Sequence, residues 1–149
     1  VKINTAVKEA VEKFPEFKNE INFYYPNHRN MVNGSYQDTI DVFQKIKSYG
    51  FPCYVLSNWS DETYEGMEDE YPFLKEFDDK IISGREFLVK PDPQIYKLAM
   101  SRFDLVPEET LFIDDREDNI QAAENLGFQT IHLTDPSTIK SDIKKFLVV

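Results

Sequence analysis

The sequence predicts a doubly wound α/β fold, in which helices cover both faces of a parallel β-sheet. Short apolar runs alternate along most of the chain with segments whose apolar residues recur at helical spacing, and this alternation is typical of parallel sheets with crossover helices. With 41% hydrophobic residues, including 12 Phe and 8 Tyr, the chain of 149 residues can form a substantial core. We therefore expect one α/β core with a small N-terminal addition.

The N-terminal 33 residues are predicted to form a helical part of their own. From residue 2 to about residue 25 the apolar positions recur at helical spacing, with breaks at Pro15 and Pro26. Residues 27–35 are rich in turn-forming Asn and Gly, so we interpret them as a linker. The chain thus divides into residues 1–33 and a core over residues 34–149.

The core is predicted to contain four strands and the helices that connect them. A helix over residues 36–49 ends at Gly50, since glycine is favoured directly after a helix. Asp92 is suited to cap the helix that follows it. The predicted strands cover residues 53–56, 80–83, 110–113 and 129–133. The helical segments between and after them cover residues 62–75 (irregular), 93–103, 117–126 and 137–146.

Composition and charge argue against several classes of partner and site. The formal net charge is −10 and no stripe of Lys and Arg is present, so we expect neither nucleic acid nor a membrane surface as a partner. No apolar run approaches the roughly 20 residues that a membrane span needs. Cys53 is the single cysteine, which excludes an internal disulfide and favours the cytoplasm. His28, His132 and Trp59 are interpreted as packing or surface residues, because two isolated histidines lack a paired metal-ligand spacing.

Polar residues follow three predicted strands at the end where such sheets bind ligands. Ser57 follows the first strand, Lys90 lies in the loop after the second, and Asp114 and Asp115 follow the third. Each has an ordinary explanation as a turn serine, a solvated lysine or a helix-capping aspartate. Together they can form a phosphoryl-transfer site, because adjacent carboxylates suit Mg²⁺ while a lysine and a hydroxyl bind phosphoryl oxygens.

Three stretches resemble the second, third and fourth motifs of the haloacid dehalogenase superfamily. They are Leu56-Ser57-Asn58, then Lys90-Pro91-Asp92-Pro93-Gln94-Ile95-Tyr96, and Phe112-Ile113-Asp114-Asp115 followed by Asn119, Ala122, Ala123, Leu126 and Gly127. The resemblance runs from about Gly34 to Leu133 and is nearest to members with a helical cap, including sugar-phosphate phosphatases and the phosphatase domain of epoxide hydrolases. It implies a Rossmann-like core, with residues 1–33 as the end of the cap and its linker. Leu88 and Val89 depart from it, because many relatives have glycine and a basic or polar residue there.

The resemblance implies a phosphatase that acts on a small phosphorylated metabolite. It assigns Ser57 to binding a phosphoryl oxygen through its hydroxyl, helped by the backbone N–H of Asn58. It assigns Lys90 to neutralising both the nucleophile and the transferred phosphoryl group. These three residues would therefore form the substrate-binding part of the site.

The same resemblance implies Mg²⁺ as the cofactor. Asp115 would be the direct metal ligand, and Asp114 would share the metal or hold its water. Asn119 would orient this acidic loop from behind. Asp115, Ser57 and Lys90 would together make up the catalytic set.

The nucleophile that the resemblance requires is not among these motifs. It is the first Asp of an Asp-x-Asp-x-Thr/Val sequence directly after the first core strand, and the second Asp is the general acid/base. Asp38 and Asp41 lie in a helical pattern and follow no apolar strand, so they do not replace it. We expect upstream residues or another chain to supply this motif, on a central strand between the strands of Ser57 and Asp114. The chain by itself is therefore expected to be inactive.

Other functions compete with the phosphatase. A phosphomutase uses the same groups, whereas a 2-haloacid dehalogenase needs no metal and leaves Asp114 and Asp115 unexplained. A receiver domain carries its acidic pair before the hydroxyl and the lysine, and the order here, Ser57, Lys90 and then the aspartates, disfavours it. A non-catalytic binding remnant would account for the absent nucleophile motif alone.

Overall fold

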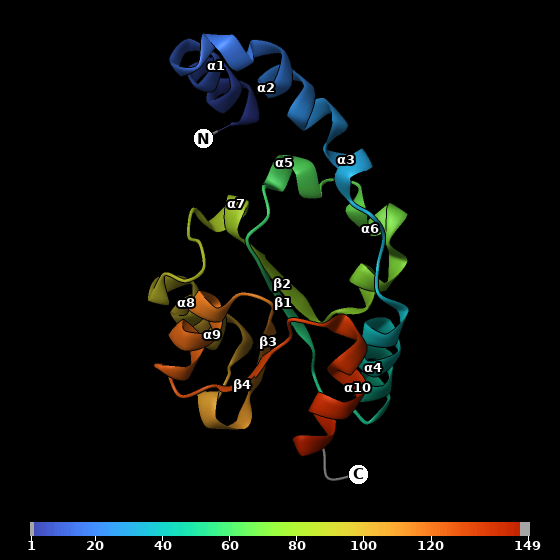
Figure 1. Cartoon of the computed structure of the whole chain (residues 1–149). Helices are drawn as coiled ribbons and strands as arrows, with labels where there is room; N and C mark the ends of the chain where they lie inside the picture. Colours follow the sequence, from blue (N-terminus) through green and yellow to red (C-terminus); the bar gives the residue numbers. More distant parts are fainter. Residues whose placement is uncertain (1, 147–149) are drawn as a thin grey trace.

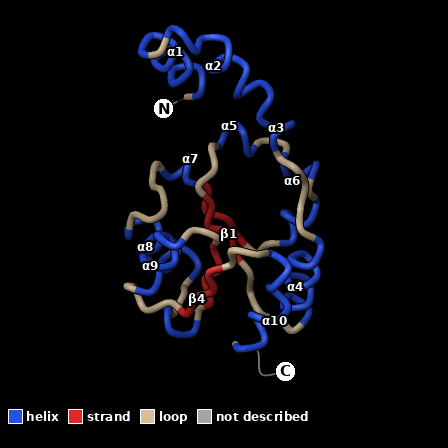
Figure 2. The backbone as a smooth tube through the Cα atoms, viewed as in Figure 1, coloured by secondary structure: helices blue, strands red, loops and turns tan. Residues whose placement is uncertain are grey.

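The computed structural model describes residues 2–146, whose four strands form two parallel pairs. The strands are β1 (Tyr54–Ser57), β2 (Asp79–Ile82), β3 (Leu111–Asp114) and β4 (Gln129–His132), and β1 pairs with β2 while β3 pairs with β4. The strands lie in the middle of the core with helices around them (Figures 1 and 2). The α/β class and the parallel direction agree with the prediction, and the division into two pairs is consistent with the expected position of a central strand between β1 and β3.

Helices surround both strand pairs. The helices of the core are α4 (Gln37–Ser48), α5 (Asp61–Tyr64), α6 (Met67–Glu70), α7 (Ser83–Glu86), α8 (Pro93–Phe103), α9 (Glu117–Glu124) and α10 (Ile139–Asp142), with 3₁₀ turns at Pro72–Glu76, Pro107–Glu109, Pro136–Thr138 and Ile143–Lys145. Helix α8 begins as predicted, because the Asp92 carboxylate accepts a hydrogen bond from the Gln94 N–H at 2.8 Å. The helix predicted over residues 137–146 is instead the short α10 between two 3₁₀ turns, a common form at helix ends.

Helix α8 joins the two strand pairs into one core. Its Phe103 ring stacks on Tyr54 of β1, with ring centroids 4.3 Å apart. Nearer the start of the helix, Tyr96 packs edge-on against Phe112 of β3 at 5.5 Å. Ile95 is fully buried in the same core cluster. Because large aromatic rings contribute much of the apolar area in such a core, α8 is an important apolar link between the pairs.

The edge of β1 that faces away from β2 has unpaired backbone groups. The carbonyl groups of Cys53 and Trp59 accept hydrogen bonds from residues flanking β2. Successive residues of a strand direct their backbone groups to opposite sides. The N–H and C=O groups of Tyr54 and Leu56 therefore point away from β2, toward the other strand pair.

The edge of β3 that faces away from β4 is open in the same way. The carbonyl groups of Thr110 and Asp114 accept hydrogen bonds from residues flanking β4, so Leu111 and Ile113 direct their backbone groups to the other side. Ile113 is also 37% exposed, which is unusual for a large apolar residue of a central strand. Within residues 2–146 no strand pairs with either inner edge. This arrangement is consistent with a central strand between β1 and β3, and that strand stays a prediction.

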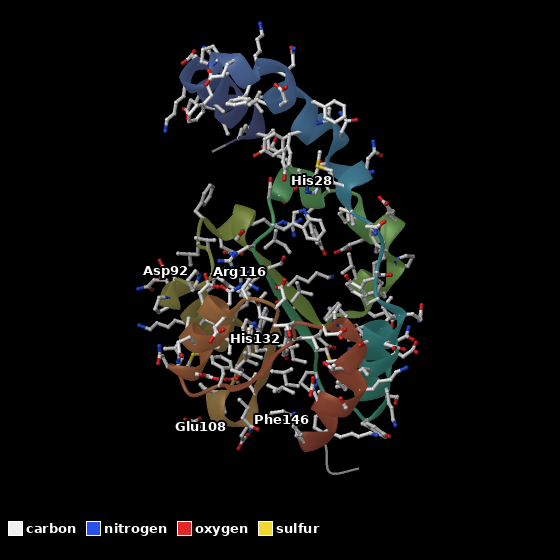
Figure 3. The ribbon with its side chains drawn as sticks, viewed as in Figure 1. His28, Asp92, Glu108, Arg116, His132 and Phe146 are labelled. Atoms are coloured by element: carbon white, nitrogen blue, oxygen red, sulfur yellow. The ribbon has the colours of Figure 1, made fainter. Side chains whose placement is uncertain are left out.

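The N-terminal helices lie beyond the carboxyl ends of the strands. They are α1 (Ile3–Lys13), α2 (Lys18–Tyr24) and α3 (His28–Met31), separated by 3₁₀ turns at Pro15–Phe17 and Tyr25–Asn27. In Figure 3, Glu108 before β3 and Arg116 after β3 lie toward opposite ends of the core, which gives the strand direction. His28 of α3 lies beyond Arg116, and so beyond the carboxyl end of β3. None of the described helices is long and apolar enough to cross a membrane.

The segment interpreted as a linker, residues 27–35, contains helix α3, which its turn-rich sequence did not indicate. Arg29 fixes α3 to the core, since its Nη2 donates a hydrogen bond to the carbonyl oxygen of Glu65 at 2.6 Å. Gly66 makes room for this contact, because a Cβ at its position, where φ is +79°, would meet the Arg29 guanidinium. A second contact joins the Ile3 N–H to the Glu62 carboxylate at 2.7 Å. Tertiary docking of Arg29 thus stabilises a helix that the turn-rich sequence disfavours.

The open edges predict a specific pattern of hydrogen exchange. In the 149-residue chain the amides of Leu56 and Ile113 should exchange faster than those of Val55 and Phe112, because alternate amides of each strand have no strand partner. The neighbouring residues are matched controls, since they share each strand's local stability. The measurement is amide exchange followed by NMR. Equal protection of neighbouring amides would show that both inner edges are paired.

Candidate active site

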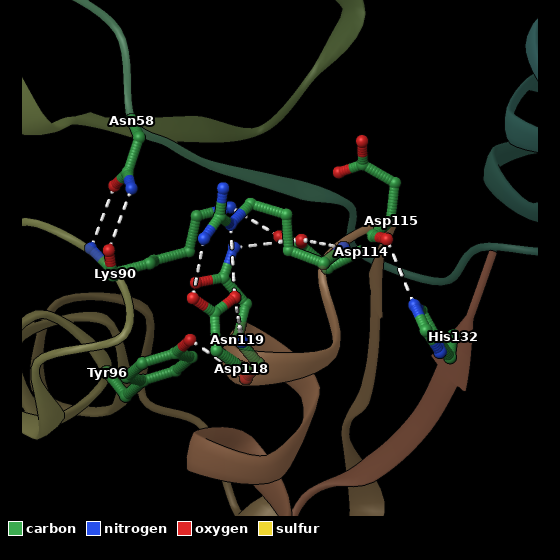
Figure 4. A network of polar contacts seen from close by, with 9 residues as sticks. Asn58, Lys90, Tyr96, Asp114, Asp115, Asp118, Asn119 and His132 are labelled. Atoms are coloured by element: carbon green, nitrogen blue, oxygen red, sulfur yellow. Dashed lines mark hydrogen bonds and ion pairs between the residues drawn. The ribbon is translucent and has the colours of Figure 1, made fainter. Parts of the chain in front are cut away.

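The carboxyl ends of β1 and β3 and the loop after β2 meet at one edge of the core (Figure 4). The structure brings together there every residue that the sequence singled out: Ser57 and Asn58 at the end of β1, Lys90 before α8, Asp114 and Asp115 at the end of β3, and Asn119 in α9. Strand direction explains this convergence, because parallel strands all end on the same side.

A buried ion pair forms the centre of the site. Lys90 Nζ donates to Asp114 Oδ2 at 2.6 Å, and the two side chains are only 9% and 6% exposed. Asn119 Nδ2 and the Arg116 N–H each donate to Asp114 Oδ1 at 2.9 Å. Burial alone would raise the pKa of Asp114, but the hydrogen bonds from Lys90, Asn119 and Arg116 outweigh it and hold that pKa below its ordinary value. The Asp114 carboxylate is therefore ionised and fully hydrogen-bonded at neutral pH.

The side chain of Asn58 fixes the backbone of Lys90. Its Nδ2 donates to the Lys90 carbonyl oxygen and its Oδ1 accepts from the Lys90 N–H, both at 2.8 Å. The Lys90 ammonium also lies 5.5 Å from the centroid of the Phe112 ring. The loop after β2 is thus tied to the end of β1 and the ammonium is held over β3. Sequence reasoning assigned only the backbone N–H of Asn58 a role and missed this clamp.

Asp115 points away from the ion pair. Asp115 is exposed to solvent, and its carboxylate makes no hydrogen bond or ion pair within residues 2–146. Its backbone is held instead, because His132 Nε2 lies 3.0 Å from the Asp115 carbonyl oxygen. Figure 4 shows the two adjacent carboxylates directed to different sides of the loop. The sequence could not indicate that His132, interpreted as a packing or surface residue, contacts this loop.

Asn119 is held in place by a buried tyrosine. The Tyr96 hydroxyl donates to the Asn119 carbonyl oxygen at 2.9 Å, and burial raises the pKa of Tyr96, so this donor stays protonated. Asn119 is 2% exposed, and its Oδ1 is buried without a hydrogen-bond partner among the described residues. Tyr96 lies in the third motif stretch, but its contact with α9 depends on the packing of two helices and carries no sequence signal.

The oxygen donors at this edge suit a cation that needs few protein ligands. The described part of the chain contains no group of three or more His, Cys, Asp or Glu side chains that could hold a metal. Mg²⁺ needs only one or two carboxylates and keeps water and substrate oxygens as its other ligands. The Asp115 carboxylate, which is unengaged among the described residues, can supply the single protein ligand that this requires. The hydroxyl of Ser57 makes no hydrogen bond to the described residues and can act as a donor to an anion.

A family model for haloacid dehalogenase-like hydrolases matches residues 3–127 of the chain. The chain belongs to the haloacid dehalogenase-like hydrolases. Among curated relatives it is 37% identical over 110 residues to mouse (Mus musculus) acyl-CoA dehydrogenase family member 10, and 33% identical over 104 residues to bifunctional epoxide hydrolase 2 of Sus scrofa. These matches cover 71% and 67% of this chain but only 10% and 19% of the two relatives.

Solved structures of haloacid dehalogenase-like enzymes have the same fold. An enzyme from Bacteroides thetaiotaomicron, crystallised as an aspartate-to-alanine mutant with magnesium and inorganic phosphate, is 27% identical with a TM-score of 0.59, and the match covers 64% of this chain and 52% of that one. A dehalogenase with an intermediate complex is 28% identical with a TM-score of 0.61, and the match covers 66% and 43%. The chain therefore spans about half the length of these enzymes.

The two aspartates are predicted to differ in their effect on stability. Asp114→Asn should lower the free energy of unfolding by about 3–5 kcal/mol, because it leaves the Lys90 ammonium buried without a counter-charge. Asp115→Asn is the matched control and should change it by no more than about 0.5 kcal/mol, because that carboxylate is exposed and unpaired. Urea unfolding of the two variants measures the difference. Equal losses would contradict the buried ion pair.

Proposed function

We propose that the protein is a Mg²⁺-dependent phosphoric monoester hydrolase that acts on a small phosphorylated metabolite. The proposal rests on the different contacts of the two aspartates. Asp114 is bound to Lys90 and Asn119, while the Asp115 carboxylate is unengaged among the described residues. A fixed ammonium and a free carboxylate that extend from the same edge of the core suit a phosphoryl group and a metal ion.

The phosphoryl group would bind between β1 and the loop after β2. The Ser57 hydroxyl and the backbone N–H of Asn58 would each donate to a phosphoryl oxygen. Lys90 has three N–H donors and uses one on Asp114, so the others can neutralise the phosphoryl oxygens. The Asn58 clamp keeps the ammonium in this position, and such fixed donors stabilise developing charge without reorganisation.

The metal would be held by Asp115, with Asp114 and Asn119 holding the loop from which Asp115 extends. A Mg²⁺ ion bound there would supply positive charge to the phosphoryl oxygens. His132 contributes by fixing the Asp115 backbone, and Asn119 contributes by holding Asp114 through its Nδ2. Asp115 is therefore proposed as the direct ligand and Asp114 as a positioning residue.

The nucleophile would be a carboxylate on a strand that pairs with the inner edges of both β1 and β3. Such a strand would satisfy the backbone groups of Leu56 and Ile113 and place its carboxyl end between Ser57 and Asp114. Its first Asp would attack phosphorus and break the ester P–O bond, while its second Asp gives a proton to the leaving oxygen. Water would then hydrolyse the aspartyl-phosphate. The strand would come from upstream residues or from another chain.

A haloacid dehalogenase is the second candidate, because a dehalogenase is among the similar structures. Carboxylate attack on a carbon–halogen bond needs no metal. In that reaction the unpaired Asp115 carboxylate would have no role. A phosphomutase would use every group that the phosphatase uses. The described residues contain no feature that favours the mutase over the hydrolase, and a phosphate-release assay separates the two.

The metal assignment is tested in the complete protein, including the residues that supply the nucleophile. Asp115→Asn should abolish Mg²⁺-dependent phosphate release with little change in fold, because it removes the direct ligand. Calorimetric titration with Mg²⁺ measures the affinity directly. Equal Mg²⁺ affinity in the wild type and in Asp115→Asn would disprove the assignment.

The 149-residue chain alone is expected to show no turnover of p-nitrophenyl phosphate. It has phosphate-binding groups but lacks the carboxylate that forms the covalent intermediate. The assay compares the chain with its Lys90→Ala variant, with circular dichroism as the folding control. Mg²⁺-dependent hydrolysis that Lys90→Ala removes would show that a residue within the chain is the nucleophile.

A further inference from the structure

Phe87 combines two unfavourable features at the carboxyl end of α7. Its side chain is 83% exposed, the highest value among the exposed large hydrophobic residues of the described chain. Its backbone is in the left-handed region, with φ 56° and ψ 25°, which a bulky residue rarely adopts. Asp104, the other such non-glycine residue in residues 2–146, belongs to a type that tolerates this region. A strained backbone that exposes an apolar ring points to a role outside the packing of the core.

The residues around Phe87 are fixed, so its backbone has a defined position. Arg85 is bound to the first residue of α5 at 2.6 Å, and Glu86 is bound to α8 at 2.7 Å. On the other side, Lys90 is clamped by Asn58. The surroundings therefore over-determine the backbone at Phe87, which is the condition under which strain persists.

The position of Phe87 is close to the proposed phosphate site. Lys90 follows it by three residues, and three residues of chain span at most about 11 Å. Helix α7 follows β2 directly, and Figure 1 shows it at the end of the core that faces the N-terminal helices. Val89, which is 53% exposed, adds a second apolar side chain to the same loop. The loop that leads to Lys90 thus exposes two apolar side chains close in the chain to the proposed phosphate site.

We propose that Phe87 is a specificity-determining residue that contacts the organic part of the substrate, and that this part is an aromatic or hydrocarbon group. The inference rests on the proposed function, because it assumes a phosphate ester held by Lys90. A phosphoryl group at Lys90 leaves the esterified group outside the rim, where the Phe87 ring and Val89 can cover its apolar surface. Burial of that surface is favourable for an apolar ester and brings nothing to a polyol phosphate.

The test compares two esters in the complete protein, phenyl phosphate and glycerol phosphate. Phe87→Ala should lower kcat/KM for phenyl phosphate about tenfold, which corresponds to about half of the effect of burying a whole ring. It should change kcat/KM for glycerol phosphate by less than about twofold. Phe87→Leu should keep part of the preference, because it retains an apolar side chain. Phe51→Ala is the matched control: Phe51 is 49% exposed but precedes β1, at the far end of the core, so both esters should be unaffected.

A second readout tests the strain without using activity. Phe87→Gly and Phe87→Ala both remove the ring, but only glycine adopts the left-handed region freely. Phe87→Gly should therefore melt about 3 °C above Phe87→Ala. Equal Tm values for the two variants would show that the backbone at Phe87 is not strained and would contradict the inference.

The activity outcomes separate the inference from the proposed function. If wild type hydrolyses both esters and Phe87→Ala lowers kcat/KM equally for both, or for neither, Phe87 does not determine specificity and the inference is wrong. If wild type releases phosphate from neither ester with Mg²⁺, the proposed function fails and the inference fails with it. Selective loss with phenyl phosphate, together with an unaffected Phe51→Ala variant, supports both.

Discussion

The structure of the site depends on the buried ion pair between Lys90 and Asp114. Each charge is almost removed from water, and such a pair is maintained only where further hydrogen bonds satisfy its remaining donors and acceptors. Asn119 and the backbone of Arg116 supply these bonds to the carboxylate, and Asn58 fixes the backbone of the lysine. The pair also links the loop after β2 to the end of β3. The β1–β2 and β3–β4 pairs share no strand ladder within residues 2–146. This link and the packing of α8 therefore help to hold the two strand pairs together.

The ion pair also explains why two adjacent aspartates have different properties. Asp114 accepts three hydrogen bonds, one of them from the Lys90 ammonium, so its charge is already compensated inside the protein. Asp115 keeps its charge at the surface, next to a hydrogen-bonded backbone that cannot easily move. Two exposed carboxylates side by side would repel each other, and removing one of them into an ion pair relieves that repulsion. The result is a single directed anionic group at the carboxyl end of β3, which is a suitable arrangement for one hard cation.

The inner edges of β1 and β3 set the second constraint. Unpaired N–H and C=O groups inside a core cost about 1–3 kcal/mol each when no partner replaces water, and exposed edges readily accept another strand. Here the two edges belong to strands whose carboxyl ends carry Ser57 and Asp114, so a strand inserted between them would end at the centre of the site. The same inserted strand would then complete both the β-sheet and the catalytic site. The N-terminal helices, docked through Arg29, lie over the same end of the core.

The sequence by itself determined the class of the fold, the positions of the four strands and of helices α4, α8 and α9 to within a few residues, and the identity of the residues at the strand ends. These features depend on local pattern: apolar runs, the capping residue Asp92 and the order of polar residues after each strand. It did not determine that Asn58 clamps Lys90, that His132 holds the loop of Asp115, or that residues 28–31 are helical. Those contacts join residues far apart in the chain, and their geometry exists only once α8 and the strand pairs have packed. Local propensity has no information on distant partners, and so the tertiary structure alone decided which carboxylate is buried and which stays exposed.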